Sequence, residues 1–378
     1  MHVFMWGCWG LLMAYGWVIL RRWYAWLKMP VVVKNSSIPQ TYISVIIPVR
    51  NEAQHILALL QDLEQQTYTI SNFEVIVIDD HSEDETASLI QKFKKKSDLP
   101  VHLISLQDYP GRLQKKAAIT TGITVAKGQL MVQTDGDCRV TPNWLFTLAQ
   151  YYEQTNVQCI AGPVALLEAN SLFTRMQVVE FASLIGVGGA SIALGKPNMC
   201  NGANLAYTRQ AFIMVQGFAG NEQLASGDDE FLMHKIAKSF PGQIAFLKSP
   251  ETIVRTAAQA SLSTFMQQRI RWASKWPNYS QWHIKLLALL VFGVNLGLFS
   301  SFFIWLCRGI AGTQVVYLYF FKFLIDSLFL VTVLRFLYRK MYIAYLIPLQ
   351  FVYIPYVLYT ALLGLRGTYN WKSRRVKK

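Results

Sequence analysis

The sequence is poor in cysteine and lacks the common cysteine and glycine motifs. Its 378 residues include five cysteines, with no CxxC pair and no His–Cys cluster of zinc-binding spacing. This excludes the usual cysteine-based metal sites and is typical of reduced thiols in a cytosolic domain. No P-loop and no GxGxxG run is present either. A ligand that carries phosphate groups would therefore need a metal ion to bridge them to the protein.

The chain also has few acidic residues, 22 Asp and Glu against 36 Lys and Arg, which gives a formal net charge of +14. A charge of this sign is compatible with nucleic-acid binding. However, many of the basic residues flank long apolar runs, where anionic lipid headgroups attract each of them by about 1 kcal/mol. We therefore expect the lipid bilayer as a partner and no nucleic acid.

Four apolar runs are each long enough to cross the hydrocarbon core of a bilayer, about 30 Å thick. They cover residues 3–20, 286–306, 312–334 and 343–365. Basic residues follow the first run, and no small-residue cleavage site comes after it, which indicates an uncleaved anchor and not a signal peptide. By the positive-inside rule the domain after this anchor is cytoplasmic, so we expect a multi-pass protein of the inner (plasma) membrane.

The membrane prediction leaves three points open. Four complete crossings would place the basic tail, residues 367–378, outside the cell, unless one run lies in the interface or re-enters. Lys322 and Asp326 stand one helical turn apart and would neutralise each other in a helix bundle, or else take part in a substrate path. The apolar segment 180–195 carries four glycines and would be an interfacial element or a packed helix and loop.

Between the anchor and the later runs, the chain alternates strands with helices. Apolar, β-branched runs predict strands over residues 42–49, 73–80, 101–106 and 129–134. Strands this apolar that alternate with helices indicate an α/β fold with a parallel sheet covered on both faces. The sequence also predicts N-caps at Asn51 and Ser82, each followed three residues later by Gln or Glu, and a helix that ends at Gly128.

Acidic residues gather where these strands end. Ligands of parallel α/β sheets bind beyond the carboxyl ends of the strands. Three such ends carry residues 48–52, 79–84 and 135–137, so their carboxylates should converge on one rim. A cluster of carboxylates is unfavourable unless a cation neutralises it, and oxygen ligands suit Mg2+ or Mn2+. The sequence therefore predicts a divalent metal site.

Five segments in order resemble the inverting glycosyltransferases of family 2, which have the GT-A fold. The three strand ends read SVIIPVRNE, IDDHSEDET and TDGD, and the later segments read SGDDEFL and QRIRW, the last fitting the Gln-x-x-Arg-Trp pattern of the family. The resemblance covers about residues 41–275. It implies that a nucleotide diphosphate sugar, with a UDP-sugar as the expected donor, binds at the rim.

The resemblance also implies roles for single residues in donor binding. Asp80 contacts the base or ribose with Asp79 beside it, and Asp135 and Asp137 form the Asp-x-Asp pair, with Asp137 as the direct metal ligand. Lys115 stands where the family has a lysine before Ala-Leu-Asn, although the run here reads KAAIT. Further donor-binding residues are expected at Pro48, Arg50 and Glu52.

The two later segments, which resemble the acceptor half of the family, contain the proposed catalytic base and a helix that would contact the leaving group. Inversion needs a carboxylate opposite the leaving nucleotide to take the proton of the acceptor hydroxyl. The family match implies Asp229 for this role, supported by Asp228, although acids also stabilise the first turn of a helix. Gln268, Arg271 and Trp272 share one helical face. Arg271 would neutralise the departing diphosphate, and the indole of Trp272 would form a flat wall against the sugar or base. The alternative is that this segment is a basic helix on the membrane surface.

These expectations combine into an anchor (1–28), a cytosolic GT-A domain (41–275), a transmembrane region (283–366) and a basic tail (367–378). The predicted activity is transfer of a sugar from a nucleotide diphosphate sugar to a lipid or lipid-linked acceptor. One alternative is a processive polysaccharide synthase. A second alternative is a non-catalytic subunit that keeps the fold.

Overall fold

The computed structural model describes the chain except residues 1, 31–37, 110, 112, 168–169, 223, 225, 367, 372–373 and 378; from residue 366 on it describes only the backbone. The chain forms two compact units. The sheet unit comprises Met29–Leu167 and Ser191–Ala257, and the helical unit comprises Met1–Lys28, Glu168–Ala190 and Ala258–Lys378.

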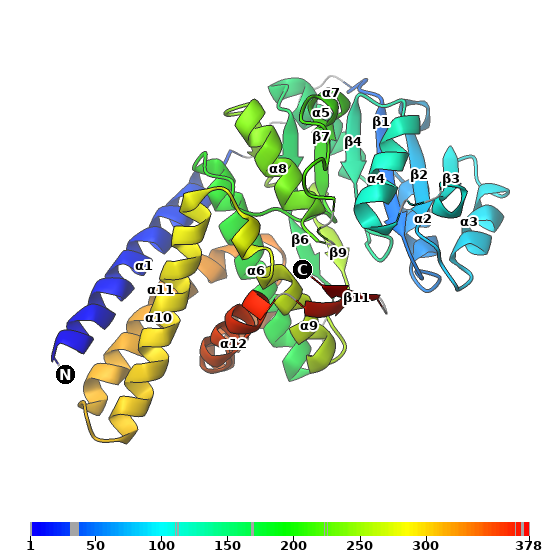
Figure 1. The fold of residues 1–378 in the computed structure, drawn as a ribbon. Coiled ribbons are helices and arrows are strands. Elements are labelled where there is room, and N and C mark those ends of the chain that lie inside the picture. The colour runs from blue at the N-terminus through cyan, green and yellow to red at the C-terminus, as the bar shows by residue number, and fades with distance from the viewer. Residues whose placement is uncertain are drawn as a thin grey trace. The chain divides into compact units, whose positions relative to one another are not determined.

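The sheet unit is built on a seven-stranded, mostly parallel sheet (Figure 1). In spatial order the strands are β3 (Val101–Ser105), β2 (Phe73–Asp79), β1 (Ile43–Val49), β4 (Leu130–Gln133), β7 (Leu205–Thr208), β5 (Cys159–Ala161) and β8 (Ile244–Phe246). The first four are parallel to one another, whereas β7 is antiparallel to β4 and β5. All four predicted strands are confirmed within one residue at each end. The carboxyl ends of β1, β2 and β4 consequently share one edge of the sheet.

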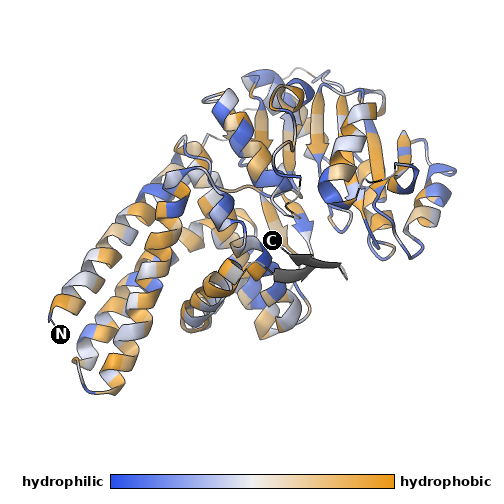
Figure 2. Cartoon of the chain, in the orientation of Figure 1, coloured by the Kyte–Doolittle hydropathy of each residue, from blue (hydrophilic) through white to orange (hydrophobic). Residues whose placement is uncertain are grey.

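Helices and short elements surround this sheet. They are α2 (Ile56–Glu64), α3 (Thr86–Lys94), α4 (Gln114–Val125), α5 (Trp144–Thr155), α7 (Arg209–Met214), α8 (Asp228–Ser239), the 3-10 turns η1 (Ile70–Asn72), η2 (Leu106–Asp108) and η3 (Pro250–Thr252), and the parallel pair β6 (Val164–Leu166) with β9 (Val254–Thr256). The strands at the centre of the sheet are mostly apolar, and nearly every residue in them is buried (Figure 2). Such runs are typical of strands buried on both faces.

The predicted helix caps at Asn51 and Ser82 are wrong. α2 begins at Ile56 after His55, and α3 begins at Thr86 after Glu85. Asn51 instead adopts a left-handed φ of 54° and accepts a hydrogen bond from the backbone N–H of Glu83 (2.8 Å), while Ser82 accepts one from the N–H of Asn51 (2.9 Å). Because β1 and β2 are neighbours, the loops that follow them lie together. The side chains of Asn51 and Ser82 therefore accept hydrogen bonds from the backbone of the adjacent loop and not from the first turn of the helix that follows them.

Gly128 does not end a helix, contrary to the prediction, because α4 already ends at Val125. A Cβ at residue 128 would lie 2.4 Å from the backbone nitrogen of Ser44. The N–H of Gly128 donates to the Ser44 hydroxyl (2.8 Å), which donates to the buried Glu74 carboxylate (2.6 Å). Glycine is therefore needed here for close backbone approach at the start of β1.

The helical unit contains the long apolar helices (Figure 2). Its elements are α1 (His2–Lys28), α6 (Leu172–Ala193), α9 (Leu262–Ala273), η4 (Trp276–Asn278), α10 (Trp282–Leu306), α11 (Gly312–Phe336), η5 (Lys340–Tyr345), α12 (Leu346–Arg366) and the hairpin β10 (Thr368–Trp371) with β11 (Arg374–Lys377). α1, α10 and α11 lie side by side (Figure 1). All four predicted apolar runs form helices.

Within the described residues, five helical segments are long and apolar enough to cross a membrane. They are His2–Lys28, Leu172–Ala193, Trp282–Leu306, Gly312–Phe336 and Lys340–Leu365. The second of these is α6, which was not among the four runs predicted from the sequence. It is one continuous helix and is mostly buried inside the protein.

Lys322 and Asp326 neutralise each other within the helical unit, as the first interpretation of their spacing proposed. The ammonium of Lys322 lies 2.7 Å from Asp326 Oδ2, and Tyr15 of α1 donates to Asp326 Oδ1 (2.6 Å). The Gln350 amide contacts both charged groups, at 3.0 and 2.9 Å. This polar network therefore links α1, α11 and α12.

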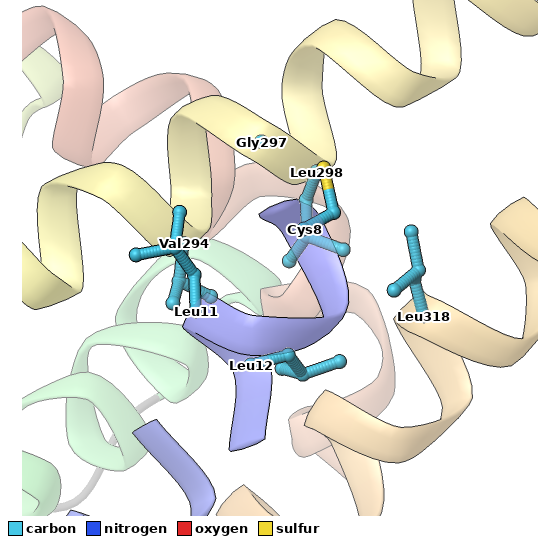
Figure 3. A pocket seen from close by; sticks show the side chains of 7 residues that line it. All are labelled: Cys8, Leu11, Leu12, Val294, Gly297, Leu298 and Leu318. Atoms are coloured by element: carbon cyan, nitrogen blue, oxygen red, sulfur yellow. The ribbon is translucent and has the colours of Figure 1, made fainter. Parts of the chain in front are cut away.

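A small cavity lies between α1, α10 and α11 (Figure 3). Its volume is about 10 Å³, near the lower limit for one water molecule, which would also need two or more polar partners. The lining residues are Cys8, Leu11, Leu12, Val294, Gly297, Leu298 and Leu318. A void this small and apolar is a packing gap, not a ligand site.

Candidate active site

The loops after β1 and β2 hold each other through polar contacts, with Arg50 at the centre. The Arg50 guanidinium donates to the carbonyl oxygen of Asp80 (3.0 Å) and pairs with Glu83 (3.0 Å). The backbone N–H of Glu52 donates to the hydroxyl of Thr86 (2.8 Å), and that of Ala53 to the Asp84 carboxylate (3.1 Å). Arg50 and Glu52, both predicted to bind the donor, therefore lie in the contact between these two loops.

Asp79 and Asp80, at the end of β2, are both buried, at 4% and 3% exposure. Asp80 Oδ1 lies 3.1 Å from Nδ1 of His81. Asp79 Oδ2 accepts a hydrogen bond from the N–H of Ser82 (3.2 Å), whereas its buried Oδ1 has no hydrogen-bond partner among the described residues. An unpaired buried carboxylate oxygen costs about 1–3 kcal/mol or more. A ligand that donates a hydrogen bond to Asp79 would remove this cost.

The TDGD turn after β4 packs directly against the first loop. A Cβ at Gly136 would lie 2.8 Å from Val49 Cγ1 and 3.2 Å from Glu52 Cγ. Only glycine fits this approach without displacing the neighbours. Pro48, one residue earlier in β1, is aligned with Ile78 of β2. The predicted convergence of the three strand ends is thus present in the fold.

Lys115 of α4 links two of the predicted acids. Its ammonium lies 2.6 Å from Asp135 Oδ1 and 3.2 Å from Asp228 Oδ2. The amide of Gln133, the last residue of β4, donates to the same oxygen of Asp228 (3.0 Å). Gly202 packs on this cluster, since a Cβ there would lie 3.0–3.2 Å from Gln133, Asp228 and Lys115. One lysine therefore joins the donor half of the sequence to the acceptor half.

The charges of this cluster shift its pKa values. Burial opposes ionisation of Asp228, but the charge and hydrogen bond of Lys115, together with the Gln133 amide, lower the pKa of Asp228 overall. Burial raises the pKa of Asp135, Lys115 offsets part of that rise, and Asp137 adds to it. Although burial lowers the pKa of Lys115, Asp135 and Asp228 raise it above its ordinary value. Lys115 is therefore charged at neutral pH.

Asp229 has a separate set of contacts from Asp228. Its Oδ2 accepts a hydrogen bond from the N–H of Gly202 (2.9 Å), and its Oδ1 accepts one from the N–H of Glu230 (2.8 Å). Both acids lie in the first turn of α8, which begins after Gly227 at a left-handed φ of 81°. They thus stabilise the helix N-terminus as well as forming part of the site.

The residues present fit a divalent cation that is bound jointly with phosphates. Within the described residues no group of three or more His, Cys, Asp or Glu side chains forms a metal site by itself. Asp137 accepts hydrogen bonds from Thr256 (3.1 Å) and Cys138 (3.7 Å), and no described Lys or Arg pairs with it. Mg2+ commonly binds one or two carboxylates plus substrate phosphates and water. Asp137 and Asp135 supply such a donor set.

The QRIRW segment lies in the helical unit, on α9, whereas the acids described above lie in the sheet unit. Gln268, Arg271 and Trp272 are all partly exposed. Arg269, which the sequence analysis did not single out, is buried between them. Its only signal in the sequence is a second arginine inside the motif.

A mostly parallel sheet with acids at its strand ends, in a chain that also carries long apolar helices, defines a GT-A glycosyltransferase with membrane helices. The chain belongs to glycosyl transferase family 2: residues 44–214 match the family described as glycosyl transferase family 2, and residues 131–363 match glycosyl transferase family group 2. The predicted family and fold are confirmed.

Curated relatives and a solved structure agree with this assignment. The chain is 29% identical over 202 residues to glycosyltransferase AglE of Haloferax volcanii, and 34% identical over 105 residues to dolichyl-phosphate beta-glucosyltransferase ALG5D of Trichomonas vaginalis. These matches cover 51% and 26% of this chain, but 60% and 31% of those proteins. A poly-beta-1,6-N-acetyl-D-glucosamine synthase of Staphylococcus epidermidis is 24% identical over 273 residues, 70% of this chain and 62% of that one.

The structure of mannosyltransferase PcManGT from Pyrobaculum calidifontis, in complex with GDP-Man and Mn2+, shares the fold. The TM-score is 0.60 at 20% sequence identity, and the alignment covers 93% of this chain and 97% of that chain. At this identity the likeness establishes the fold alone.

Proposed function

We propose that the protein is a metal-dependent, inverting glycosyltransferase that moves a sugar from a nucleotide diphosphate sugar to a lipid or lipid-linked acceptor. The observation that carries this proposal is the cluster in which Lys115 joins Asp135 to Asp228 beside Asp137, which has no cationic partner among the described residues. Relatives named as transferases of dolichyl phosphate and undecaprenyl phosphate support a lipid-linked acceptor.

The donor binds at the edge formed by β1, β2 and β4. Asp79 and Asp80 recognise the base or ribose, and the unpaired Oδ1 of Asp79 is the acceptor that a base N–H or a ribose hydroxyl would satisfy. Pro48, Arg50 and Glu52 shape the wall of this site through the contacts between the two loops. UDP is the expected nucleoside diphosphate, and the GDP-Man held by the neighbour makes GDP the first alternative to test.

Asp137 and Asp135 would hold Mg2+ or Mn2+ together with the diphosphate. When bound, such an ion supplies Lewis-acid stabilisation of the leaving nucleoside diphosphate. The Mn2+ present in the neighbouring mannosyltransferase supports this assignment. Lys115 contributes a fixed positive charge beside Asp135. The resemblance to the family assigns the leaving group to Arg271 and further donor contacts to Gln268 and Trp272.

The chemistry is a single displacement. Asp229 removes the proton from the acceptor hydroxyl, whose oxygen attacks the anomeric carbon as the bond to the diphosphate breaks. Two backbone N–H groups orient the Asp229 carboxylate. Asp228 is committed to Lys115 and Gln133, with a lowered pKa, so its role is to hold Lys115 and the start of α8. No covalent intermediate is required.

A processive polysaccharide synthase is the second candidate. The match to a poly-beta-1,6-N-acetyl-D-glucosamine synthase over 70% of the chain favours it. Product length separates the two functions: long polymer from the purified protein would contradict the single-transfer proposal. A non-catalytic subunit is a third possibility, which nucleotide release by the purified protein would exclude.

The decisive experiment measures nucleotide release by purified protein in lipid nanodiscs across a panel of UDP- and GDP-sugars, with and without EDTA. The proposal expects release from one donor that EDTA abolishes and that Mn2+ or Mg2+ restores. Turnover unaffected by EDTA would contradict the roles of Asp135 and Asp137. Asp229→Asn serves as the inactive reference, because its amide cannot accept the proton.

We also propose that the protein lies in the inner membrane with its active site in the cytoplasm. The five apolar helical segments and the basic residues around them support this placement. Residues 1–28, 41–275, 283–366 and 367–378 remain our proposed anchor, catalytic domain, transmembrane region and tail. Reporter fusions after residues 28 and 366 would test the orientation of both ends.

A further inference from the structure

Arg269 forms a buried ion pair with Glu180 inside the helical unit. The two side chains are 5% and 4% exposed. Arg269 Nε donates to Glu180 Oε1 at 2.9 Å, and a second guanidinium nitrogen donates to Glu180 Oε2, so the pair is bidentate. Glu180 lies on α6 and Arg269 on α9. A bidentate pair constrains direction as well as distance.

The same guanidinium contacts two of the residues that the family motif assigns to the donor. It lies over the ring of Trp272 at 4.3 Å, and its third nitrogen donates to the side-chain oxygen of Gln268. The ring of Phe265 also lies 4.5 Å from it. The Arg269 side chain is thus nearly fully buried and contacts both α6 and its neighbours on α9. One face of the Trp272 indole is consequently covered by the guanidinium.

Further contacts hold α9 at both ends. Before its first turn, the amide of Gln177, one turn from Glu180 on α6, donates to the carbonyl of Gln259 and accepts from its N–H, both at 2.9 Å. At its last turn, Gly364 of α12 approaches Ala273 so closely that a Cβ would lie 2.7 Å from the alanine side chain. Tyr356 of α12 donates to Glu180 Oε1 (3.0 Å). Both supporting helices belong to candidate membrane spans.

We propose that the Glu180–Arg269 pair is a positioning device that sets the rotation of α9 and thereby the directions of Gln268 and Trp272. A buried pair of this kind contributes little net stability, because desolvation of both charges offsets their attraction. The pair acts through its geometry, because without its two hydrogen bonds α9 can rotate about its own axis. The inference rests on the proposed function only in assigning Gln268 and Trp272 to the donor.

The test compares two broken ion pairs in the same unit. Glu180→Gln removes one partner of Arg269, and Asp326→Asn, the matched control, removes one partner of Lys322, a buried pair without contact to the motif. Both variants should lose thermal stability. Only Glu180→Gln should raise the donor KM, by about tenfold or more among the folded molecules. Arg269→Lys should do the same, because an ammonium keeps the charge but not the fork or the flat stacking surface.

A second measurement does not depend on turnover. In a Gln268→Cys background, the maleimide labelling rate at residue 268, followed by peptide mass spectrometry, should change at least threefold on adding Glu180→Gln and stay constant on adding Asp326→Asn. The positioning role would be overturned if Glu180→Gln and Asp326→Asn gave the same donor KM and, in the Gln268→Cys background, the same labelling rate at residue 268. If the wild type released no nucleotide, the proposed function would fail, while the labelling comparison would still decide this inference.

Discussion

Replacing Lys115 with methionine removes the ammonium group that pairs with both Asp135 and Asp228. Methionine keeps much of the apolar stem and removes the ammonium. The two carboxylates would then face each other near Asp137 without Lys115. We expect a less stable protein whose stability depends more strongly on divalent cations than that of the wild type.

The magnitude follows from the distances. With an effective dielectric constant of about 20, unit charges 2.6 and 3.2 Å apart attract by roughly 5–6 kcal/mol each before desolvation is counted. Lys115 is 21% and Asp135 34% exposed, so water screens part of this attraction. We expect a net loss of about 1–3 kcal/mol of unfolding free energy, between the values for exposed and fully buried pairs.

Thermal unfolding in nanodiscs, with the nucleoside diphosphate present and with either EDTA or Mn2+, measures this effect. Lys115→Met should lower Tm in EDTA, and Mn2+ should raise Tm more for the variant than for the wild type, because the ion replaces the missing charge. Lys115→Arg should restore much of the loss, and Lys96→Met, in the exposed turn that follows α3, should change nothing. Equal Mn2+ shifts in wild type and variant would refute the reasoning.

The pH dependence has a defined sign. The pKa of Asp228 is lowered in the folded protein by Lys115, so this pair stabilises the fold above the ordinary Asp pKa of about 3.9. The stabilisation is lost as pH falls through the lower folded value. The Tm difference between wild type and Lys115→Met should therefore be larger at pH 7 than near pH 3. A Tm difference between wild type and Lys115→Met that grows toward acid pH would contradict the assigned pKa shift of Asp228.

Three further predictions concern the site and the core. Asp229→Asn should reduce nucleotide release in the presence of acceptor by about 10²–10⁴ without changing donor affinity, measured by turnover and calorimetry; a loss of donor binding would instead assign it to the donor site. Asp137→Asn should weaken Mn2+ binding in the presence of the nucleoside diphosphate at least tenfold by titration calorimetry; unchanged affinity would remove it from the metal site. Gly128→Ala should lower Tm by several degrees, because its Cβ would meet the Ser44 backbone at 2.4 Å; an unchanged Tm would show that β1 can shift.

The strands and the long apolar helices could be predicted because their signals are local. Each central strand is a mostly apolar run, and each long helix is long enough to cross a bilayer. The order of acidic segments then predicted the family and the edge of the sheet at which they meet. The helix starts were predicted less well, because Asn51 and Ser82 are residue types that favour N-caps but here form hydrogen bonds with the neighbouring loop.

The sequence by itself determined the GT-A fold, the family and the candidate acids, since apolar periodicity and motif order are properties of the chain alone. Only the tertiary structure decided how charges far apart in the sequence pair. Lys115 contacts Asp228 across 113 positions, and Arg269 contacts Glu180 across 89, distances at which spacing carries no information. The physical reason is that ion pairs depend on which elements pack together. That packing gave Lys115 two carboxylates and Asp137 no cation among the described residues.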